Sequence, residues 1–371
     1  MADKRRSFYG WGFEQDAVSV DEMAWFEGTW AKLFKVDGFE PAPMPSESEI
    51  DLRAPRMAIP KTLQAFCTAE KYDRLFHSYG ASVHDLARMI HHRDFSNPPD
   101  AVAYVRDEAD IQAVLDWCGS NDLAAIPFGG GSSVVGGVNP PSDERYRGTV
   151  TINLGKLNKV LEIDKTSQAA RVQAGVLGPD LENQLRASGL TMRFFLQAWE
   201  FSSLGGWIAT RAAGHFATVY TQIDDHVESL RVVTPEGLIA SRRVPASGAG
   251  PNPDRLFLGS EGTLGIITEA WVRLHRRPTI RLATTVRFGD YEQAVAAVRE
   301  ITQAGLYPAN ARLLERSEAA FTEAGDGSAD VLVLTFESAD HPLEPWMDRA
   351  LEICGDHGGK WDREALGQAD S

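Results

Sequence analysis

Cysteine is scarce in this chain, which has only three among its 371 residues. Cys67, Cys118 and Cys354 are far apart, form no CxxC pair and have no histidines at zinc-site spacing. The sequence therefore predicts neither a disulfide framework nor a metal site, and it is typical of a reducing, cytoplasmic setting. Long apolar runs are also missing, so neither a membrane span nor a secretory signal is expected behind the basic start MADKRRSFYGWGFEQD.

Positive charge is in short supply, with 37 Lys and Arg against 52 Asp and Glu and a formal net charge of -15. Nucleic acids and anionic membranes repel a net acidic protein, so no nucleic-acid partner is expected, although local peripheral contact with a membrane stays open. The hydrophobic share of 43% indicates a globular protein, and the length favours more than one domain. Composition leaves the oligomeric state open, a homodimer included.

Three parts differ in sequence pattern. Residues 1–100 are predicted to form a mostly helical arm, with helices over 19–36 and 59–72. Its aromatic residues are expected to pack on the core rather than bind a ligand; they are Trp11, Phe13, Trp25, Phe26 and Trp30. Residues 101–278 mix strands, helices and a hairpin, which indicates an α+β domain. Residues 279–371 follow a β-α-β then β-α order, as at the start of a ferredoxin-like unit. We find no final core strand in the tail and expect a shortened chain.

A first glycine-rich block, PFGGGSSVVGG, begins at Pro127. The successive glycines Gly129, Gly130 and Gly131 let consecutive backbone N–H groups turn toward one anion, and two serines add hydroxyl donors. The block lacks the lysine of a Walker loop and the glycine spacing of a Rossmann fingerprint. On its own it is as consistent with a flexible turn as with a phosphate loop.

A second block, GSEGTLGIITEA, runs from Gly259 to Ala270, and EFSSLGGWIATRAAG lies between the two. Glycines in such a strand fit either a backbone that approaches a ligand or a buried β-bulge. Gly205 and Gly206 fit either the same close approach or a tight turn into a helix.

The strings PFGGGSSVVGGV, EFSSLGGWIATRAAG, RVVTPEG and FLGSEGTLGIITEAWVRLHRRP, in this order, resemble the flavoprotein family that includes vanillyl-alcohol oxidase, p-cresol methylhydroxylase and FAD-dependent D-lactate dehydrogenase. With YGASVHDLARM, they are most similar to its alkyldihydroxyacetonephosphate synthase subfamily. The resemblance runs from about Tyr72 to the chain end. It implies a two-subdomain p-cresol methylhydroxylase-type FAD-binding domain at 101–278 and an incomplete ferredoxin-like cap domain at 279–371.

The resemblance also implies four segments that contact FAD. The first is Pro127, Phe128, Gly129, Gly130, Gly131, Ser132 and Ser133; the second is Gln197, Ala198, Trp199, Glu200, Phe201, Ser202 and Ser203; the third is Thr210, Arg211, Ala212 and Ala213; the fourth is Glu261, Gly262, Thr263, Leu264, Gly265, Ile266 and Ile267. Because no histidine or cysteine lies within 127–137, we expect the FAD to be bound non-covalently.

Several of these residues have ordinary alternatives. Arg211 fits either a cation beside phosphate or flavin, or an exposed salt bridge. The pair Asp224-Asp225 is interpreted as turn-capping rather than acid catalysis. Thr221 stands where the subfamily has a glycine, so a residue suited to positive φ is missing there. Where the family has a His-x-Pro-Asp/Glu-Ser run, this chain has FFLQAW from Phe194, which puts the local backbone contact in question.

The resemblance implies a transferase of ether-lipid biosynthesis, which exchanges acyl for alkyl on dihydroxyacetone phosphate through an adduct at flavin N5. The substrate would be a small or lipid-like molecule. No catalytic residue is predicted, because those of the subfamily belong to a stretch after the end of this chain. An FAD-dependent 2-hydroxyacid (D-lactate-type) dehydrogenase is the alternative, and a flavin-binding fragment without full activity is the third interpretation.

Overall fold

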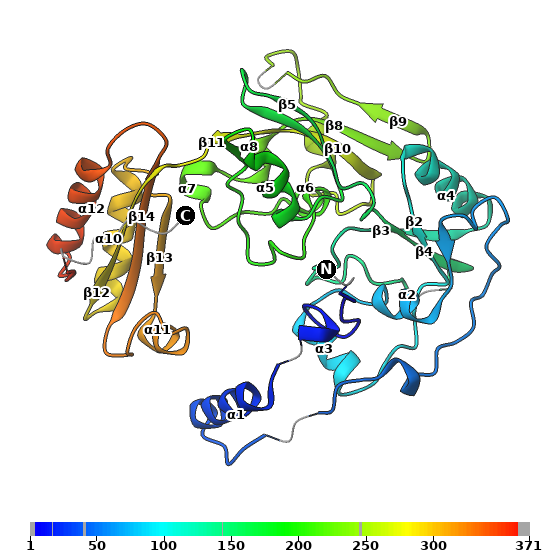
Figure 1. Cartoon of the computed structure of the whole chain (residues 1–371), viewed down its shortest axis with the longest axis horizontal. Coiled ribbons are helices and arrows are strands. Elements are labelled where there is room, and N and C mark those ends of the chain that lie inside the picture. The colour runs from blue at the N-terminus through cyan, green and yellow to red at the C-terminus, as the bar shows by residue number, and fades with distance from the viewer. Residues whose placement is uncertain (1–3, 17, 40–41, 143, 245–246, 363–371) are drawn as a thin grey trace.

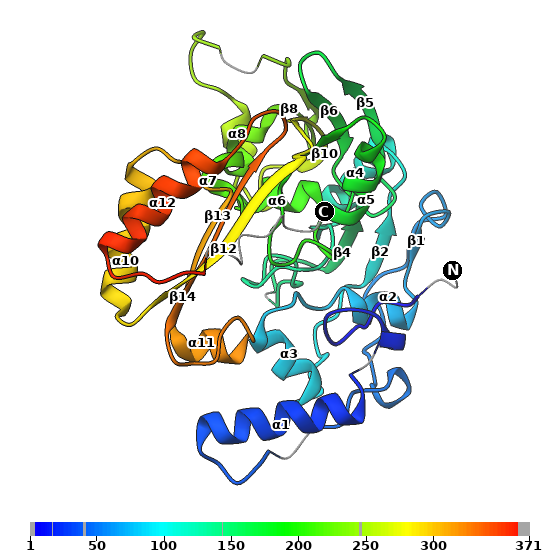
Figure 2. The same cartoon turned by 60° about the vertical axis from the view of Figure 1, so that its left-hand side comes forward.

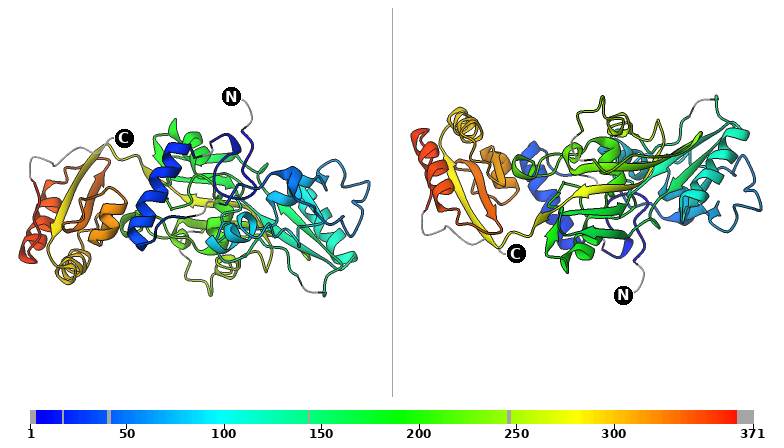
Figure 3. Two further views of the ribbon diagram at one scale, coloured as in Figure 1. Left: turned by 90° about the horizontal axis from the view of Figure 1, so that it is seen from below. Right: turned by 90° about the horizontal axis from the view of Figure 1, so that it is seen from above.

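The computed structural model describes residues 4–16, 18–39, 42–142, 144–244 and 247–362. Its strands form sheets of four, five and three strands and one short two-stranded pair, with helices packed between and around them (Figure 1). This is the α+β class expected from the sequence. The four-stranded sheet lies at one end, the three-stranded sheet at the other, and the five-stranded sheet between them (Figure 3). No described helix is long and apolar enough to cross a bilayer.

The four-stranded sheet sets the position of the first glycine block. Its order is β1 (Cys67–Thr68), β2 (Ala101–Tyr104), β4 (Gly148–Asn153) and β3 (Leu123–Phe128), and the last three strands are parallel. Helix α4 (Glu108–Ser120) is the crossover between β2 and β3. Every residue of β4 is buried, as parallel strands require. Phe128 pairs with Asn153, so both strands end at one edge, and the glycines begin there.

The five-stranded sheet is antiparallel and carries the second glycine block at the start of its central strand. Its order is β5 (Val160–Asp164), β6 (Ala169–Gln173), β10 (Ile266–Arg273), β8 (Val227–Thr234) and β9 (Gly237–Ala240). Strands β8 and β9 form the predicted hairpin. One face packs on α5 (Gly178–Arg186), α6 (Leu204–Thr210) and α8 (Ile223–His226), where Val172, Val232 and Val272 join the largest hydrophobic cluster.

The N-terminal arm is less helical than expected. It contains the 3-10 turns η1 (Glu14–Asp16) and η2 (Glu47–Glu49) and the helices α1 (Val20–Phe34), α2 (Lys71–Phe76) and α3 (Val83–Ile90). Helix α1 confirms the prediction for 19–36, and Ser19 caps it with Glu22. The helix predicted over 59–72 is wrong: Pro60 opens a turn, and Cys67–Thr68 pair with β2 as β1. Strand pairing and burial of Leu63 and Phe66 override the helical pattern there.

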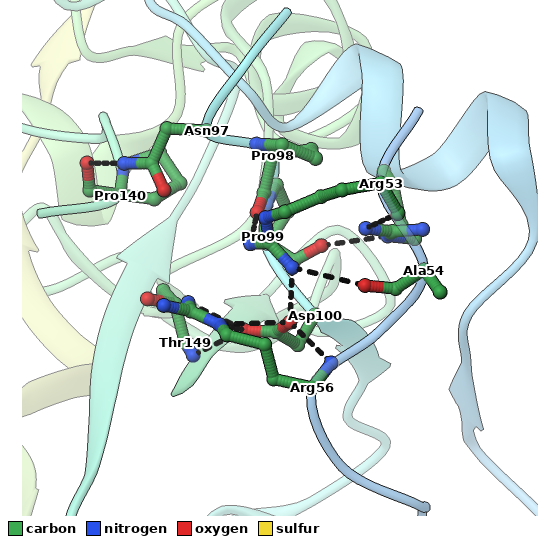
Figure 4. Close-up of polar contacts among 10 residues, drawn as sticks. Arg53, Ala54, Arg56, Asn97, Pro98, Pro99, Asp100, Pro140 and Thr149 are labelled. Atoms are coloured by element: carbon green, nitrogen blue, oxygen red, sulfur yellow. Dashed lines mark hydrogen bonds and ion pairs between the residues drawn. The ribbon is translucent and has the colours of Figure 1, made fainter. Parts of the chain in front are cut away.

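A buried carboxylate fastens the arm to the four-stranded sheet. Asp100 has a fully buried side chain that pairs with Arg53 at 2.5 Å and Arg56 at 2.7 Å (Figure 4). It also accepts from the backbone N–H groups of Arg56 at 2.9 Å and Thr149 at 2.8 Å. These hydrogen bonds hold the pKa of Asp100 down at about 2 against the opposing effect of burial. Asp100 thus joins the arm to the starts of both β2 and β4.

The C-terminal unit, residues 279–362, follows the predicted element order. It comprises β12 (Ile280–Phe288), α10 (Tyr291–Gln303), β13 (Asn310–Leu314), α11 (Arg316–Phe321), β14 (Asp330–Ser338) and α12 (Glu344–Asp356), of which α11 was not predicted. The strands lie in the order β12-β14-β13, and α10 and α12 cover the face turned away from the rest (Figure 1). Beyond α12 the chain returns to the outer edge of β12, where Lys360 and Arg287 exchange hydrogen bonds of 2.8 and 2.9 Å. The rest of the predicted strandless tail, 363–371, lies outside the described residues.

Side chains from three parts of the chain meet at the C-terminal unit. Helix α1 lies near α11 (Figure 2), and Trp30 of α1 packs on Phe321 of α11 with ring centroids 4.8 Å apart. On the sheet face opposite to α10 and α12, Glu337 is almost fully buried and pairs with Arg193 and, at 3.4 Å, with Arg281. Arg193 belongs to the irregular segment after β7 (Leu190–Thr191), a strand that pairs with β11 (His275–Arg276). The Glu337 pair therefore joins the two major parts of the molecule.

Candidate cofactor site

The glycine-bearing segments meet around one cavity of about 360 Å³, a size within the range of ligand sites. It lies between the end of β3, helix α6 and the start of β10. The predicted residues that line it are Pro127, Phe128, Gly129, Gly130, Gly131, Ser132, Ser133, Ala198, Ser202, Ser203, Thr210, Ala212, Glu261, Gly262, Gly265, Ile266 and Ile267. Each of the four predicted segments therefore contributes residues to the lining of this cavity.

Packing between segments demands glycine in the first block. A Cβ on Gly129 would lie 2.1 Å from Oγ of Ser203, and one on Gly130 would lie 1.6 Å from the carbonyl oxygen of Phe201. Gly131 has a φ of +75° and faces the ring of Phe128 at 2.5 Å. The first and second predicted segments are thus pressed together, which leaves no room for any larger residue.

The same loop offers hydrogen-bond donors to the cavity. Within the described part of the chain, the N–H groups of Gly130, Gly131, Ser132 and Ser133 donate to no protein acceptor. Consecutive N–H groups of this kind form a natural anion site, and backbone donors next to a cavity need a partner. A pyrophosphate fits these donors, so the residues present are suited to the phosphate part of FAD.

The second predicted segment divides between the cavity and the protein core. Ala198, Ser202 and Ser203 line the cavity, whereas Gln197, Trp199, Glu200 and Phe201 do not. The indole of Trp199 packs on Gly178 at the start of α5. A Cβ on Gly178 would lie 2.3 Å from Nε1 of Trp199. Phe201 contacts aromatic residues of the arm instead, with Trp11 at 6.1 Å and Phe13 at 5.9 Å between centroids.

In the third segment Thr210 and Ala212 line the cavity, but Arg211 and Ala213 lie outside it. Arg211 ends α6 in the left-handed conformation and pairs with Asp224, while its side-chain carbons touch Gly259. The arrangement matches the salt-bridge interpretation of Arg211. Asp224 also pairs with Arg255 at 3.2 Å, so Arg211 and Arg255 share one carboxylate.

The fourth segment brings the second glycine block against the first. Gly262 has a φ of +81° and faces the ring of Pro127. A Cβ on Gly262 would lie 2.8 Å from Cγ of Pro127. Gly265, at φ +158°, lies against Val232 of the neighbouring strand β8. A register shift does follow between Ile267 and Glu269, so a β-bulge and a cavity wall occur together. Thr263 and Leu264 do not line the cavity, and Leu264 is half exposed.

Sequence reasoning missed part of the lining. Gly205 and Gly206 line the cavity and fit the close approach to a ligand that the sequence allows. The lining residues that the sequence does not predict are Val134, Val135, Gly137, Val138, Leu154, Leu196, Trp207 and Ala209. Most are apolar neighbours of predicted residues, and extension of each motif by a few positions would have found them. Leu154 carries no such signal, since it enters only because β4 ends beside β3 and its N–H donates to the Phe128 carbonyl at 3.0 Å.

A neutral histidine supports the base of the glycine loop. His77 is completely buried and its ring lies 4.3 Å from that of Phe128, centroid to centroid. Its Nδ1 lies 2.6 Å from the Asp73 carbonyl oxygen, and its Nε2 lies 2.8 Å from Nδ2 of Asn153, which donates to it. Burial lowers the pKa of His77 to about 4, so the ring is neutral at pH 7. No group of metal-ligating side chains occurs among the described residues.

A second cavity, polar and about 290 Å³ in volume, lies at the start of the second predicted segment. It is lined by Gln197, His215, Asn310, Ala311 and Arg312, and so lies between the irregular segment of the core and β13 of the C-terminal unit. Gln197 is flanked by Leu196 and Ala198, which line the larger cavity. The two cavities are therefore neighbours, one made by glycine loops and one by polar side chains.

The sequence model of a family described as "FAD binding domain" matches residues 99–241, which include the first three predicted segments. Alkyldihydroxyacetonephosphate synthase of Dictyostelium discoideum is 36% identical over 249 residues, 67% of this chain and 40% of that protein. A solved structure of an alkyldihydroxyacetonephosphate synthase matches with a TM-score of 0.84 at 27% identity, over 96% of this chain and 74% of that one. The chain belongs to the FAD-binding flavoprotein family of p-cresol methylhydroxylase and vanillyl-alcohol oxidase.

Other members of the family are more distant from this chain. A probable mitochondrial D-lactate dehydrogenase of Danio rerio is 32% identical over 293 residues, 76% of this chain and 58% of that protein. The structure of p-cresol methylhydroxylase with substrate bound shares the fold, with a TM-score of 0.66 at 16% identity over 81% of this chain and 64% of that one. The chain thus spans only part of the length of each of these family members.

Proposed function

We propose that this chain is the FAD-binding part of an alkyldihydroxyacetonephosphate synthase-like transferase. The observation that supports this most is the match to a synthase structure over 96% of the chain, arm and C-terminal unit included, at a TM-score of 0.84. In this proposal 101–278 is the two-subdomain FAD-binding domain, and 279–371 is part of a ferredoxin-like cap. The strand order β12-β14-β13 and the return of Lys360 to β12 support the second assignment.

The chain's own residues would bind and orient FAD without a covalent link. N–H groups from Gly130 to Ser133 would hold the pyrophosphate. The backbone at Gly205, Gly206, 261–262 and 265–267 would face the rest of the cofactor. Apolar lining by Trp207 and Ile267 would exclude water from that face. When bound, FAD would supply the electrophilic centre of the acyl-for-alkyl exchange.

The polar cavity beside Gln197 is proposed as the place for the substrate head group. Arg312 is half exposed, and its ion pair with Glu318, at 3.6 Å, is long enough to be weak. A cationic guanidinium beside His215 and Asn310 suits a phosphate-bearing substrate better than a neutral one. The two cavities would then hold cofactor and substrate side by side.

The test combines spectroscopy with turnover. The purified chain should bind FAD with a visible flavin spectrum and release it on acid treatment. The chain extended to the length of the synthases should convert an acyl-dihydroxyacetone phosphate and a fatty alcohol to the alkyl product without an electron acceptor. Because the flavin ends in its starting redox state, the substrate should cause no lasting bleaching. Bleaching by substrate with reoxidation by a dye would contradict the transferase.

A 2-hydroxyacid dehydrogenase is the second candidate, favoured by the match to a D-lactate dehydrogenase over 76% of this chain. Anaerobic titration with D-lactate or D-2-hydroxyglutarate distinguishes it, since hydride transfer would bleach the flavin. A yellow protein that turns over neither substrate class would favour a flavin-binding module instead. A colourless protein that cannot be reconstituted with FAD would contradict all three.

A further inference from the structure

The N-terminal strap, defined as residues 4–16, crosses the outer side of the glycine loop. Arg6 and Phe13 pair as an antiparallel bridge, which folds the strap back on itself. The Tyr72 hydroxyl donates to the Arg6 carbonyl at 2.7 Å, and Phe8 is buried in a cluster with Leu75. The bridge to Phe13 and the hydrogen bond from Tyr72 thus hold the backbone of Arg6 in place, and the position of its side chain follows from them.

Arg6 differs from its two basic neighbours in having no counter-charge. Lys4 pairs with Asp16 at 2.6 Å, and Arg5 pairs with Glu47. Among the described residues no carboxylate pairs with Arg6, and its buried Nε has no hydrogen-bond partner. Desolvation by burial lowers its pKa. A desolvated cation without a partner is costly, so its position calls for an explanation.

Aromatic rings surround the Arg6 guanidinium. Its Cζ lies 4.4 Å from the ring centroid of Phe201, 5.6 Å from that of Phe76 and 5.9 Å from that of Phe13. Cation–π attraction offsets part of the desolvation. The rings cover part of the guanidinium, and Arg6 as a whole is partly buried.

The glycine loop separates Arg6 from the cofactor cavity. A small cavity lined by Arg6 shares Phe128, Gly130 and Gly131 with the large one, so the same loop forms a wall of both. Gly130 has no side chain there and packs directly on the Phe201 backbone. Among the described residues, the lining of the large cavity contains no Lys or Arg, and Glu261 is its one charged side chain.

We infer that Arg6 supplies the positive charge that balances the FAD pyrophosphate, acting across the glycine loop rather than by contact. The inference rests on the proposed FAD site. A cation partly withdrawn from water among aromatic rings, against the wall that the two cavities share, attracts a phosphate more strongly than a fully solvated lysine would. The loop N–H groups would then make the hydrogen bonds, while Arg6 provides the field.

The experiment compares Arg6→Met with Lys4→Met in the full chain. Lys4 is the matched control, because it lies in the same strap and Asp16 already neutralises it. Dissociation constants of the cofactor-free proteins for FAD and for riboflavin, which has no phosphate, would be measured by flavin fluorescence. Arg6→Met should weaken FAD binding by about tenfold or more and leave riboflavin binding unchanged. Lys4→Met should change neither.

The thermal midpoint of the cofactor-free protein adds a second readout. Removal of an unpaired, desolvated cation should leave the midpoint of Arg6→Met equal or higher, whereas loss of a packing residue would lower it. Arg6→Lys, which keeps the charge, should bind FAD more tightly than Arg6→Met. If Arg6→Met fails to fold, Arg6→Gln carries the same comparison.

Unchanged FAD affinity in the neutral variants would overturn the inference. Equal losses for FAD and riboflavin with a lower thermal midpoint would also overturn it, since they indicate a packing role. Both results leave the proposed FAD site intact, because the wild-type protein would still bind FAD. Failure of the wild-type protein to bind FAD would overturn the proposed function together with the inference.

Discussion

Thr221 adopts a backbone conformation that is normally confined to glycine, with φ 62° and ψ −170°. A β-branched residue is especially unfavourable there, and residues held in this region cost about 1–3 kcal/mol. The Thr221 hydroxyl donates to Asp225 at 2.6 Å, which compensates in part. The chain has kept the turn without the residue that suits it.

Thr221→Gly should therefore be more stable than Thr221→Ala by about 1 kcal/mol or more. Both variants lose the hydroxyl, so the difference between their free energies of unfolding reports the cost of the backbone conformation alone. Urea unfolding of the two proteins side by side measures it. Equal midpoints would show that the turn relaxes without strain.

The lowered pKa values of two histidines predict acid sensitivity. Burial lowers the pKa values of His77 and His275 to about 4, from an ordinary value near 6.5. Unfolded chains bind protons at these sites below about pH 6.5, while the folded protein resists them until about pH 4. Stability should thus be complete above pH 6.5 and fall as the pH drops toward 4, by up to about 3 kcal/mol for the fully buried His77.

Urea unfolding of the wild-type protein and of His77→Gln between pH 4.5 and pH 7.5 checks this pH dependence. The variant should lose stability at pH 7.5 but show a shallower decline with acid, because one proton-binding difference is gone. Parallel declines in the two proteins would contradict the role given to His77.

At the scale of single elements, Asp100 ties the arm to β2 and β4. Asp100→Asn would leave Arg53 and Arg56 without their buried counter-charge and should cost about 3–5 kcal/mol. Asp326→Asn is the control, because Asp326 pairs with Arg287 in an exposed setting and its loss should destabilise the protein much less. Chemical denaturation compares the two, and similar losses would refute the importance of burial.

Local signals predicted most elements, and tertiary pairing decided the exceptions. Helix α1 has a capping box at Ser19, and buried positions alternate with less buried ones along the second half of β12 and most of β14. The segment before Lys71 departs from its helical pattern because its strand partner, β2, lies more than thirty positions away in the sequence. The site was predictable as far as glycine marks it. Trp199 and Phe201 belong to the second predicted segment, but they turn toward the core and the arm. Only contacts in the folded structure reveal these directions.

At the scale of the whole molecule, Glu337 connects the C-terminal unit to the core. It pairs with Arg193, and the Tyr220 hydroxyl lies 3.4 Å from it. Burial near this carboxylate raises the pKa of Tyr220 to about 12, so the phenol stays protonated and able to donate. Loss of the Glu337 charge would leave Arg193 desolvated between the two parts.

Glu337→Gln should therefore loosen the C-terminal unit and cost about 3 kcal/mol. Hydrogen exchange of β12 and β14 should rise relative to that of β8 and β10. Asp340→Asn is the matched control, because Asp340 forms an exposed 3.9 Å pair with Arg276 across the same junction. Equal exchange in the two variants would show that the junction is held by other contacts.

The tight packing behind the glycine loop has an evolutionary consequence. Gly129 and Gly130 leave no space for a Cβ whether or not a ligand is bound, since Ser203 and the Phe201 carbonyl fill it. A lineage that abandoned the cofactor would still be held to these glycines by the need to fold. Sequence drift at these two glycines is therefore a poor clock for loss of activity.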